Sequence, residues 1–368
     1  MTAAPSPHPE PRTRLHITTA GDPRTRGIAR GQALRAGIHG AIETYDRLFA
    51  LGGITPELVH DHADRALDTI DGFRPGARAE IEGIAAGAHV PTWRIAALNA
   101  RTEILAHSTT VPPGECTTVV RRFDRAVASA APTFGIQTWD WHVELADHWH
   151  TFAARGGRHD VVGLTEHGIL GKIGINSAGL ALHFNILGHV RDGVGGIPMH
   201  VLAAIVLEEA ADVTEALEIV RSAPIASSGS FALFDPSRAV LLDLSPAGVF
   251  EIEPENGVLL RTNHFLTPIP AANEKTWLYQ PDSTERRDFV QARLARRGAP
   301  NTPDELVDLL VTGAGEPPVT CVADPDKPLG QRWATLATVI LEPATRTATI
   351  LDGTPADAAS GTWRSLTA

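Results

Sequence analysis

The sequence is short of several residue types and patterns, and each shortage excludes a class of protein. Only two cysteines occur in 368 residues, Cys116 and Cys321, which are too few for a disulfide framework and lack the paired spacing of a structural zinc site. Eighteen apolar residues never follow one another, and residues 1–20 hold four prolines but no apolar run of a signal peptide. We therefore expect a soluble, cytoplasmic protein.

Basic residues are scarce relative to acidic ones. The chain has 43 acidic and 32 basic residues, a formal net charge of −11, and no block of basic residues. Proteins that bind nucleic acid need clustered Lys and Arg side chains to neutralise phosphates, so neither nucleic acid nor a membrane is an expected partner. The only lysines are Lys172, Lys275 and Lys327, and this bias, with the high Ala, Gly and Pro content, indicates a GC-rich bacterial source and specialised metabolism.

The first third of the chain has a helical pattern. Residues 1–23 are rich in proline, and we expect them to form a disordered lead. Apolar residues then recur at helical spacings over residues 27–51, and similar patterns follow at 56–70, 76–86 and 95–104. Residues 24–115 are therefore predicted to be a helical N-terminal part.

The pattern changes after Pro112 and Pro113. Short segments rich in β-branched and aromatic residues predict strands, with helices between and after them. The predicted strands are 117–120, 134–139, 150–153, 169–175, 180–184, 230–234, 239–244, 258–262, 337–341 and 347–351, and the predicted helices are 198–211, 213–222, 283–297 and 303–312. This arrangement favours a layered α+β protein. The change near residues 111–116 marks either a domain boundary or a processing site.

Several short motifs follow one another in a characteristic order. They comprise Gly114-Glu115-Cys116-Thr117-Thr118, Asn185, and residues 98–103, 137–141, 174–180, 196–198, 262–265, 282–286, 336–340 and 353–355. In these motifs the chain resembles the penicillin acyltransferase family of self-cleaving acyltransferases and amidases. The resemblance covers most of the chain, from residue 98 to residue 355. It identifies Cys116 as the nucleophile.

The resemblance implies an N-terminal-nucleophile hydrolase fold, a four-layer αββα sandwich, made as a precursor that cuts itself between Glu115 and Cys116. Residues 24–115 would belong to an α-subunit and residues 116–368 to a catalytic β-subunit that remains bound to it. The chemistry explains the cut, because a chain-terminal amine has a pKa of about 7.7 to 8.0 and can serve as the base of its own nucleophile.

The implied reaction proceeds through an acyl-Cys116 intermediate. The acyl group of a small N-acyl amide or acyl thioester would pass to water or to an amine, and we favour amide hydrolysis because water needs no acceptor site. No cofactor and no metal are implied. The identity of the acyl group and of the acceptor, and a homo-oligomeric state, remain open from the sequence.

The resemblance also assigns roles to polar residues. Asp140 would hydrogen-bond the Cys116 amine, and Asn185 and Asn263 would donate to, or support, the oxyanion of the tetrahedral intermediate. Arg286, or its neighbour Arg287, would pair with Asp140 or with a substrate carboxylate.

Three further positions complete these expectations. Thr118 lies two residues beyond the nucleophile, on the same side of a strand, and would assist the cut. Gln137 stands where the bile-salt hydrolase branch of the family has an arginine, and Glu115 stands where the fungal acyltransferase has glycine. These departures indicate a different choice of substrate.

Three other hypotheses compete with this one. In a metal-dependent hydrolase, Asp140, His142, His148 and His150 would be the metal ligands, with His148 and His150 on one face of a strand. A papain-like protease is disfavoured because no Cys-Gly-Ser-Cys-Trp signature surrounds Cys116. A non-catalytic protein on the same fold would not need Cys116.

Overall fold

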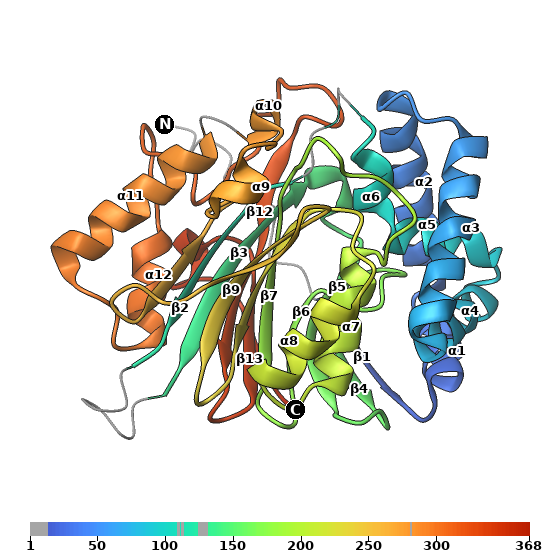
Figure 1. The fold of residues 1–368 in the computed structure, drawn as a ribbon, viewed down its shortest axis with the longest axis horizontal. Coiled ribbons are helices and arrows are strands. Elements are labelled where there is room, and N and C mark those ends of the chain that lie inside the picture. The colour runs from blue at the N-terminus through green and yellow to red at the C-terminus, as the bar shows by residue number, and fades with distance from the viewer. Residues whose placement is uncertain (1–13, 109–110, 112–113, 124–131, 280–281) are drawn as a thin grey trace, which may run out of the picture.

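Two β-sheets stacked face to face form the centre of the molecule, and helices cover both outer faces (Figure 1). The computed structural model describes residues 14–108, 111, 114–123, 132–279 and 282–368. The eight-stranded sheet has the order β1 (His16–Ala20), β4 (Trp149–Arg155), β5 (Val161–Glu166), β6 (Ile173–Asn176), β7 (Ala181–Ile186), β8 (Gly229–Phe234), β9 (Ala239–Ser245), β10 (Gly248–Ile252). The six-stranded sheet has the order β11 (Val258–Arg261), β2 (Cys116–Arg121), β3 (Phe134–His142), β12 (Trp333–Glu342), β13 (Thr347–Asp352), β14 (Trp363–Thr367).

The helices divide between the two outer faces. Against the eight-stranded sheet lie α7 (Met199–Glu209) and α8 (Val213–Ser222), with α1 (Pro23–Ala33), α2 (Arg35–Leu51), α3 (Pro56–Phe73), α4 (Pro75–Ala88), α5 (Thr92–Asn99) and α6 (Arg101–Leu105) beside them. Against the six-stranded sheet lie α11 (Asp282–Arg297) and α12 (Pro303–Leu310), and the short α9 (Pro268–Ala271) and α10 (Thr276–Tyr279) lie at one end of the strands. The predicted four-layer αββα sandwich is confirmed.

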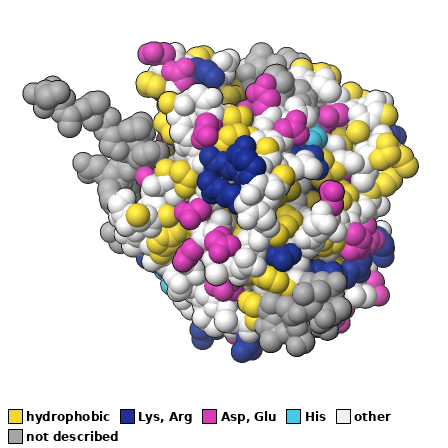
Figure 2. Space-filling model, turned by 90° about the vertical axis from the view of Figure 1, so that its left-hand side faces the viewer, with side chains coloured by type: hydrophobic (Ala, Val, Ile, Leu, Met, Phe, Trp, Pro, Cys, Tyr) yellow, Lys and Arg dark blue, Asp and Glu magenta, His cyan; other side chains and the backbone are white. Residues whose placement is uncertain are grey.

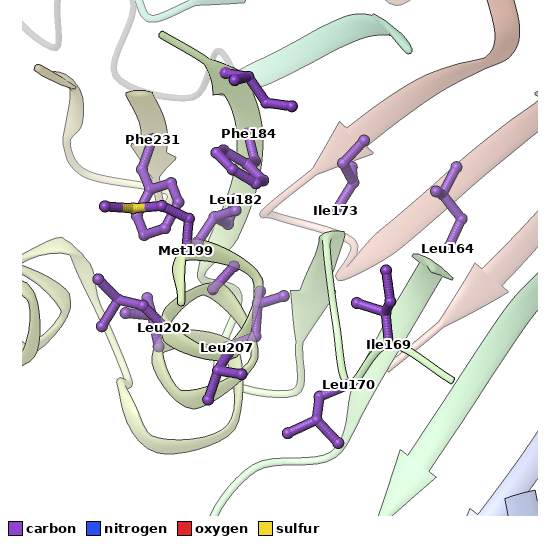
Figure 3. Packing of buried hydrophobic residues seen from close by; sticks show 14 of the residues in the cluster. Leu164, Ile169, Leu170, Ile173, Leu182, Phe184, Met199, Leu202, Leu207 and Phe231 are labelled. Atoms are coloured by element: carbon purple, nitrogen blue, oxygen red, sulfur yellow. The ribbon is translucent and has the colours of Figure 1, made fainter. Parts of the chain in front are cut away.

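Because both sheets are covered on both faces, most of their strands are buried along their whole length and have near-continuous apolar runs. Helix α7 illustrates the packing, since its apolar side chains lie directly on those of the strands (Figure 3). The side chains in contact are Met199, Leu202 and Leu207 of α7 and Leu182, Phe184 and Phe231 of β7 and β8. Burial of this apolar area stabilises the sandwich.

The N-terminus departs from the expected disordered lead. Residues 1–13 lie outside the described part of the chain, but His16–Ala20 form β1, which pairs in parallel with β4 at the edge of the eight-stranded sheet. The prediction of disorder up to residue 23 is therefore wrong for this strand. Its alternating pattern is short, and the strand exists because β4 supplies the backbone hydrogen bonds.

One predicted strand begins later than expected. Residues 169–175 were expected to be extended, but β6 begins only at Ile173. The carbonyls of Ile169 and Leu170 instead accept hydrogen bonds from Arg30, and the Leu170 amide donates to Asn99. This segment is bonded to the N-terminal helices rather than to a neighbouring strand, which no local pattern indicates.

Helices α1 and α4 approach so closely that their backbones touch. A Cβ atom placed on Gly27 would lie 2.3 Å from the Glu80 carbonyl oxygen, and one on Gly31 would lie 2.2 Å from that of Ile84. Gly83 and Gly87 of α4 face α1 in the same way. Glycines spaced four residues apart on both helices therefore permit this contact.

A buried ionic cluster joins the N-terminal helices to the sandwich. Glu166 of β5 accepts hydrogen bonds from Arg101, from Lys172 (2.9 Å) and from the Tyr45 hydroxyl (2.6 Å). All four side chains are almost inaccessible. Despite its burial, the two cations hold the pKa of Glu166 below its usual range, so it remains a carboxylate.

Among the described residues, the outer surface over α11 and α12 has no broad basic face. There, acidic and basic side chains are interspersed around one compact group of basic residues (Figure 2). None of the helices in the described part of the chain is both long and apolar enough to cross a membrane.

Candidate active site

The polar residues singled out in the sequence converge at one end of the sandwich, around Cys116. This residue begins β2, a strand in the interior of the six-stranded sheet, and stands opposite Trp139 of β3. β3 and β7 end nearby, α11 begins there, and Asn263 lies just after β11. The side chain of Cys116 is 3% exposed, so the thiol lies inside the protein rather than on its surface.

The backbone of Cys116 is held by three side chains. Its N–H donates to Asn263 Oδ1 (2.9 Å), and its carbonyl oxygen accepts from Asn185 Nδ2 (3.1 Å) and from Arg286 Nη1 (3.1 Å). All three side chains are fully buried. Residues separated by up to 170 positions in the chain thus fix the backbone of Cys116.

The orientation of the Asn185 amide is set by two neighbours. Its Oδ1 accepts hydrogen bonds from Thr118 Oγ1 (2.7 Å) and from Gln137 Nε2 (3.1 Å). With the oxygen engaged on that side, the Nδ2 donor is directed toward the Cys116 carbonyl. Thr118 and Gln137 are therefore positioning residues for Asn185, a role that the sequence did not indicate for either.

Asp140 contributes both its backbone and its carboxyl group. Its backbone N–H donates to the carbonyl oxygen of Glu115 (3.0 Å), the group that lies on the other side of the Glu115–Cys116 peptide bond. Its Oδ1 accepts from the Thr335 hydroxyl (2.6 Å), whereas Oδ2 is buried with no hydrogen-bond partner among the described residues. Burial raises the pKa of the Asp140 carboxyl to about 7, although Thr335 and Arg286 oppose the shift.

The Cys116 thiol is strongly held in its protonated form. Burial raises its pKa to about 12, and the nearby carboxylate of Asp140 adds to the shift, while Lys172 and Arg286 act against it. A thiol in this state is a poor nucleophile until a base removes its proton.

Arg286, and not Arg287, reaches the site. Besides the Cys116 carbonyl, its guanidinium donates to Thr117 Oγ1 (3.0 Å) and to Asn263 Oδ1 (3.0 Å), and its Nε donates to Asp282 (2.8 Å). Arg287, one residue later on the helix, donates instead to Gln291 at the surface. One expectation was that Arg286 pairs with Asp140. These two described side chains interact electrostatically but share no hydrogen bond.

Two expected contacts differ in the uncut chain. The N–H of Cys116 donates to Asn263 and not to the Asp140 carboxylate. The donor at the Glu115 carbonyl is the backbone of Asp140, because Asn185 Nδ2 bonds the Cys116 carbonyl and Asn263 Nδ2 bonds Ile186. The roles predicted for these side chains concern an amine and a substrate oxyanion that belong to the predicted cut form, so they stay predictions.

The sequence missed two supporting residues. Thr335 of β12 faces Asp140 across the β3–β12 pairing, and Ser283 Oγ accepts from the Asn263 backbone (2.8 Å). Ser283 belongs to a segment already singled out, so its position was a signal. Thr335 becomes visible only when the register of the two strands is known.

The histidines do not form a metal site. His142 packs its ring against Trp141 and Trp333, whereas His148 and His150 contact the ring of His167. No group of three or more histidine, cysteine, aspartate or glutamate side chains in the described residues has a geometry that would hold a metal ion. The metal-hydrolase hypothesis is therefore not supported.

Cys116 has little access to solvent in the described part of the protein. A cavity of about 290 Å³ lies between β9, β10, β11 and α11, and Cys116, Asp140 and Asn185 do not line it. The Cys116 thiol is thus closed off from a substrate in this arrangement of the chain.

Comparison with known proteins identifies the family. The model of the acyl-coenzyme A:6-aminopenicillanic acid acyl-transferase family matches residues 129–357, more than half of the chain. The chain belongs to this acyl-transferase family. It is an enzyme, an amide-cleaving hydrolase or an acyltransferase.

One relative is similar to this acyl-transferase family member over nearly the whole length of both proteins. The chain is 28% identical over 350 residues to the 40 kDa form of acyl-coenzyme A:6-aminopenicillanic-acid-acyltransferase from Emericella nidulans, covering 93% of each protein. Among solved structures, it is similar to a mutant of conjugated bile acid hydrolase from Clostridium perfringens (10% identity, TM-score 0.44, 68% of this chain and 92% of that one). It is also similar to penicillin V acylase from Agrobacterium tumefaciens (15% identity, TM-score 0.45, 68% and 86%).

Proposed function

We propose that this protein is a self-processing cysteine N-terminal-nucleophile enzyme. It cuts itself between Glu115 and Cys116, and then hydrolyses a small N-acyl amide or acyl thioester, or transfers its acyl group, through an acyl-Cys116 intermediate. The observation that carries the proposal is the geometry around one peptide bond. The Glu115 carbonyl receives the Asp140 N–H, and the following nitrogen, carbonyl and thiol of Cys116 lie in a buried polar site.

Self-cleavage would begin with transfer of the thiol proton to Asp140 Oδ2. The thiolate attacks the carbonyl carbon of Glu115, and the Asp140 N–H stabilises the negative charge that develops on the carbonyl oxygen. The C–N bond then breaks as the nitrogen of Cys116 takes up a proton, which leaves a thioester. Water hydrolyses that thioester to the Glu115 carboxylate and the free thiol.

In the cut enzyme, the new amine of Cys116 replaces Asp140 as the base. An unperturbed α-amine has a pKa of about 7.7 to 8.0, far closer to neutral pH than the buried thiol. Asn263 Oδ1 already accepts from this nitrogen, and Asp140 Oδ2, which bonds none of the described residues, can accept a second bond. Asn185 supplies a donor for the substrate oxyanion.

The two fragments have many reasons to remain together. Strand β1 of the first fragment pairs with β4 of the second, and Arg101 and Tyr45 bond Glu166 across the same boundary. The Met199 amide donates to Glu103 (2.9 Å), and Lys275 donates to the Ala106 carbonyl (2.9 Å). The N-terminal fragment is thus expected to be a permanent partner of the catalytic one.

The test is the intact mass and N-terminal sequence of purified protein, compared with Cys116→Ala and Cys321→Ala. Cys321 is the matched control, since it is the second thiol, is half-buried, and is influenced by the same charged groups. We expect fragments beginning at Met1 and Cys116 for the wild type and for Cys321→Ala, and one intact chain for Cys116→Ala. A wild-type chain that stays whole would refute the proposal, as would cleavage that persists in Cys116→Ala.

A further inference from the structure

The following inference rests on the proposed function and concerns the acyl group of the substrate. The thioester formed during self-cleavage is chemically an acyl-Cys116 intermediate, and its acyl group is the chain that ends at Glu115. The site must accommodate that acyl group and allow water to hydrolyse it. The Glu115 side chain therefore marks where the side chain of a later acyl group lies.

The Glu115 side chain is enclosed by charged groups. It is 17% exposed, and its Oε2 lies 3.4 Å from Arg286 Nη2. It also shares a hydrogen bond with the carboxyl group of Asp282, which itself accepts from Arg286 Nε. Burial raises the pKa of Glu115 to about 8, and Asp282 adds to the shift while Arg286 opposes it. The Glu115 carboxyl thus lies beside a cation and a second carboxyl, surroundings that the terminal carboxyl group of another acyl chain can share.

Tyr279 of α10 adds an unused polar group. Its phenol is 3% exposed, and its hydroxyl has no hydrogen-bond partner in the described residues. Burial raises the pKa of this phenol, and the charges of Glu115 and Cys116 add to the shift. A buried hydroxyl without a partner is costly unless a ligand satisfies it.

We propose that the cut enzyme prefers acyl groups that carry a terminal carboxyl four bonds from the reacting carbonyl, as glutamate does. A five-carbon dicarboxylic acyl group, glutaryl, has this length, and its carboxyl would contact Arg286, Asp282 and Tyr279. In the reaction, the carbonyl–nitrogen bond breaks and a carbonyl–sulfur bond forms, while the leaving amine takes the thiol proton. Water then releases glutarate and restores the thiol.

The experiment uses wild-type protein whose cut state has been verified by intact mass. Its kcat/KM is measured at neutral pH with glutaryl p-nitroanilide and with pentanoyl p-nitroanilide, which differ only in the terminal carboxyl. A carboxyl held protonated, like that of Glu115, accepts from the Arg286 guanidinium and donates to Asp282. Such charge-assisted hydrogen bonds are the stronger kind, so we expect glutaryl to be favoured by about tenfold or more. Equal or lower kcat/KM for glutaryl overturns the inference.

A pair of variants separates pocket contacts from general damage. Tyr279→Phe removes only a hydroxyl that bonds none of the described residues in the uncut fold, and we expect it to lower the glutaryl-to-pentanoyl ratio by about threefold to tenfold. Arg287→Gln, which changes the arginine outside the site, should keep the wild-type ratio. An unaltered ratio in Tyr279→Phe contradicts the assignment of that residue.

The outcomes distinguish this inference from the proposed function. A wild-type chain that stays uncut defeats both. A chain that is cut and turns over pentanoyl or other N-acyl amides, but shows no preference for glutaryl, defeats only the inference about the acyl group.

Discussion

The carboxyl group of Asp140 is subject to two opposing effects: burial favours its neutral form, and one hydroxyl donor favours its charged form. If it is the base of self-cleavage, the cutting rate should rise with pH as the carboxyl ionises around its pKa of about 7. Thr335→Val removes the hydroxyl that stabilises the carboxylate, so the pKa rises. The midpoint of the rate profile should therefore move to higher pH.

This prediction is checked by following the loss of intact precursor by mass spectrometry between pH 5 and pH 9. Thr349→Val is a suitable control, because this threonine is on β13 of the same sheet and its hydroxyl contacts Ser365 at the surface. A midpoint that does not move in Thr335→Val would show that another group is the base.

Asn185 provides the second prediction at this scale. Asn185→Ala removes a buried donor aimed at the reacting end of the site, and we expect kcat of the cut enzyme to fall about 10²-fold to 10³-fold. Asn176→Ala is the control, since its buried amide bonds the backbone of α7 and the loop after it, away from Cys116. Asn176→Ala should lower stability but not kcat of folded enzyme. A similar kcat loss in both variants would contradict the assignment.

Individual site residues were predictable to the extent that a motif contained them. Cys116, Asp140, Asn185, Asn263 and Arg286 all lie in segments whose order along the chain pointed to one family, and the structure brings them together. The motifs did not show which of these side chains positions another. That Thr118 and Gln137 fix the Asn185 amide depends on a contact between two sheets, which no local pattern encodes.

At the scale of elements, the contact between α1 and α4 makes a stability prediction. Gly31→Ala places a methyl group 2.2 Å from the Ile84 carbonyl oxygen, so the helices must separate. We expect a loss of about 1–3 kcal/mol in the free energy of unfolding, as overpacking of a tight contact usually costs. Urea denaturation of the uncut Cys116→Ala chain measures it.

Gly72→Ala is the matched control for this change. Gly72 lies on α3, and nothing in the described part of the chain stands within 4 Å of the position that its Cβ would occupy. Alanine there should stabilise the helix by about 0.5–1 kcal/mol, because glycine loses more backbone entropy on folding. If Gly31→Ala and Gly72→Ala changed the free energy of unfolding by the same amount, helix propensity and not the backbone contact would explain both changes.

Elements with strong periodicity were predicted well, whereas elements that depend on partners were not. The periodicity of residues 27–51 does predict helix, yet it hides the break between α1 and α2 at Leu34. Strands β1, β10 and β14 lie at sheet edges or are only partly buried and were missed, and so was the fully buried β5. Their extended form comes from the strand beside them.

For the whole molecule, buried neutral histidines predict sensitivity to acid. Burial lowers the pKa of His183 to about 3, from an ordinary value of 6.5. Below pH 6.5 the unfolded chain takes up a proton that the folded chain refuses, so this site lowers stability by up to about 1.4 kcal/mol per pH unit. Carboxyls with a raised pKa, such as Asp140, make the folded protein more stable as the pH falls. The contribution of His183 must therefore be measured by changing that residue alone.

The isolating measurement compares Cys116→Ala with Cys116→Ala/His183→Asn at pH 7.5 and pH 5. The variant with His183→Asn is expected to be less stable at both pH values because it loses packing against Phe234. The difference in free energy of unfolding between the two variants, called the gap below, should be about 2 kcal/mol smaller at pH 5 than at pH 7.5. The exposed His60→Gln should leave the gap constant. A gap that does not narrow would mean that His183 is protonated in the folded protein.

Strand β1 and the cluster around Glu166 carry a last consequence for the molecule as a whole. Before the cut, these contacts form within one chain, so folding is unimolecular and its rate is independent of concentration. After the cut, the same contacts must join two chains, and refolding becomes a second-order encounter of fragments that each lack part of the shared core. The cut enzyme would then persist because it unfolds slowly and not because it can refold, since the cut removes the covalent link between the two fragments.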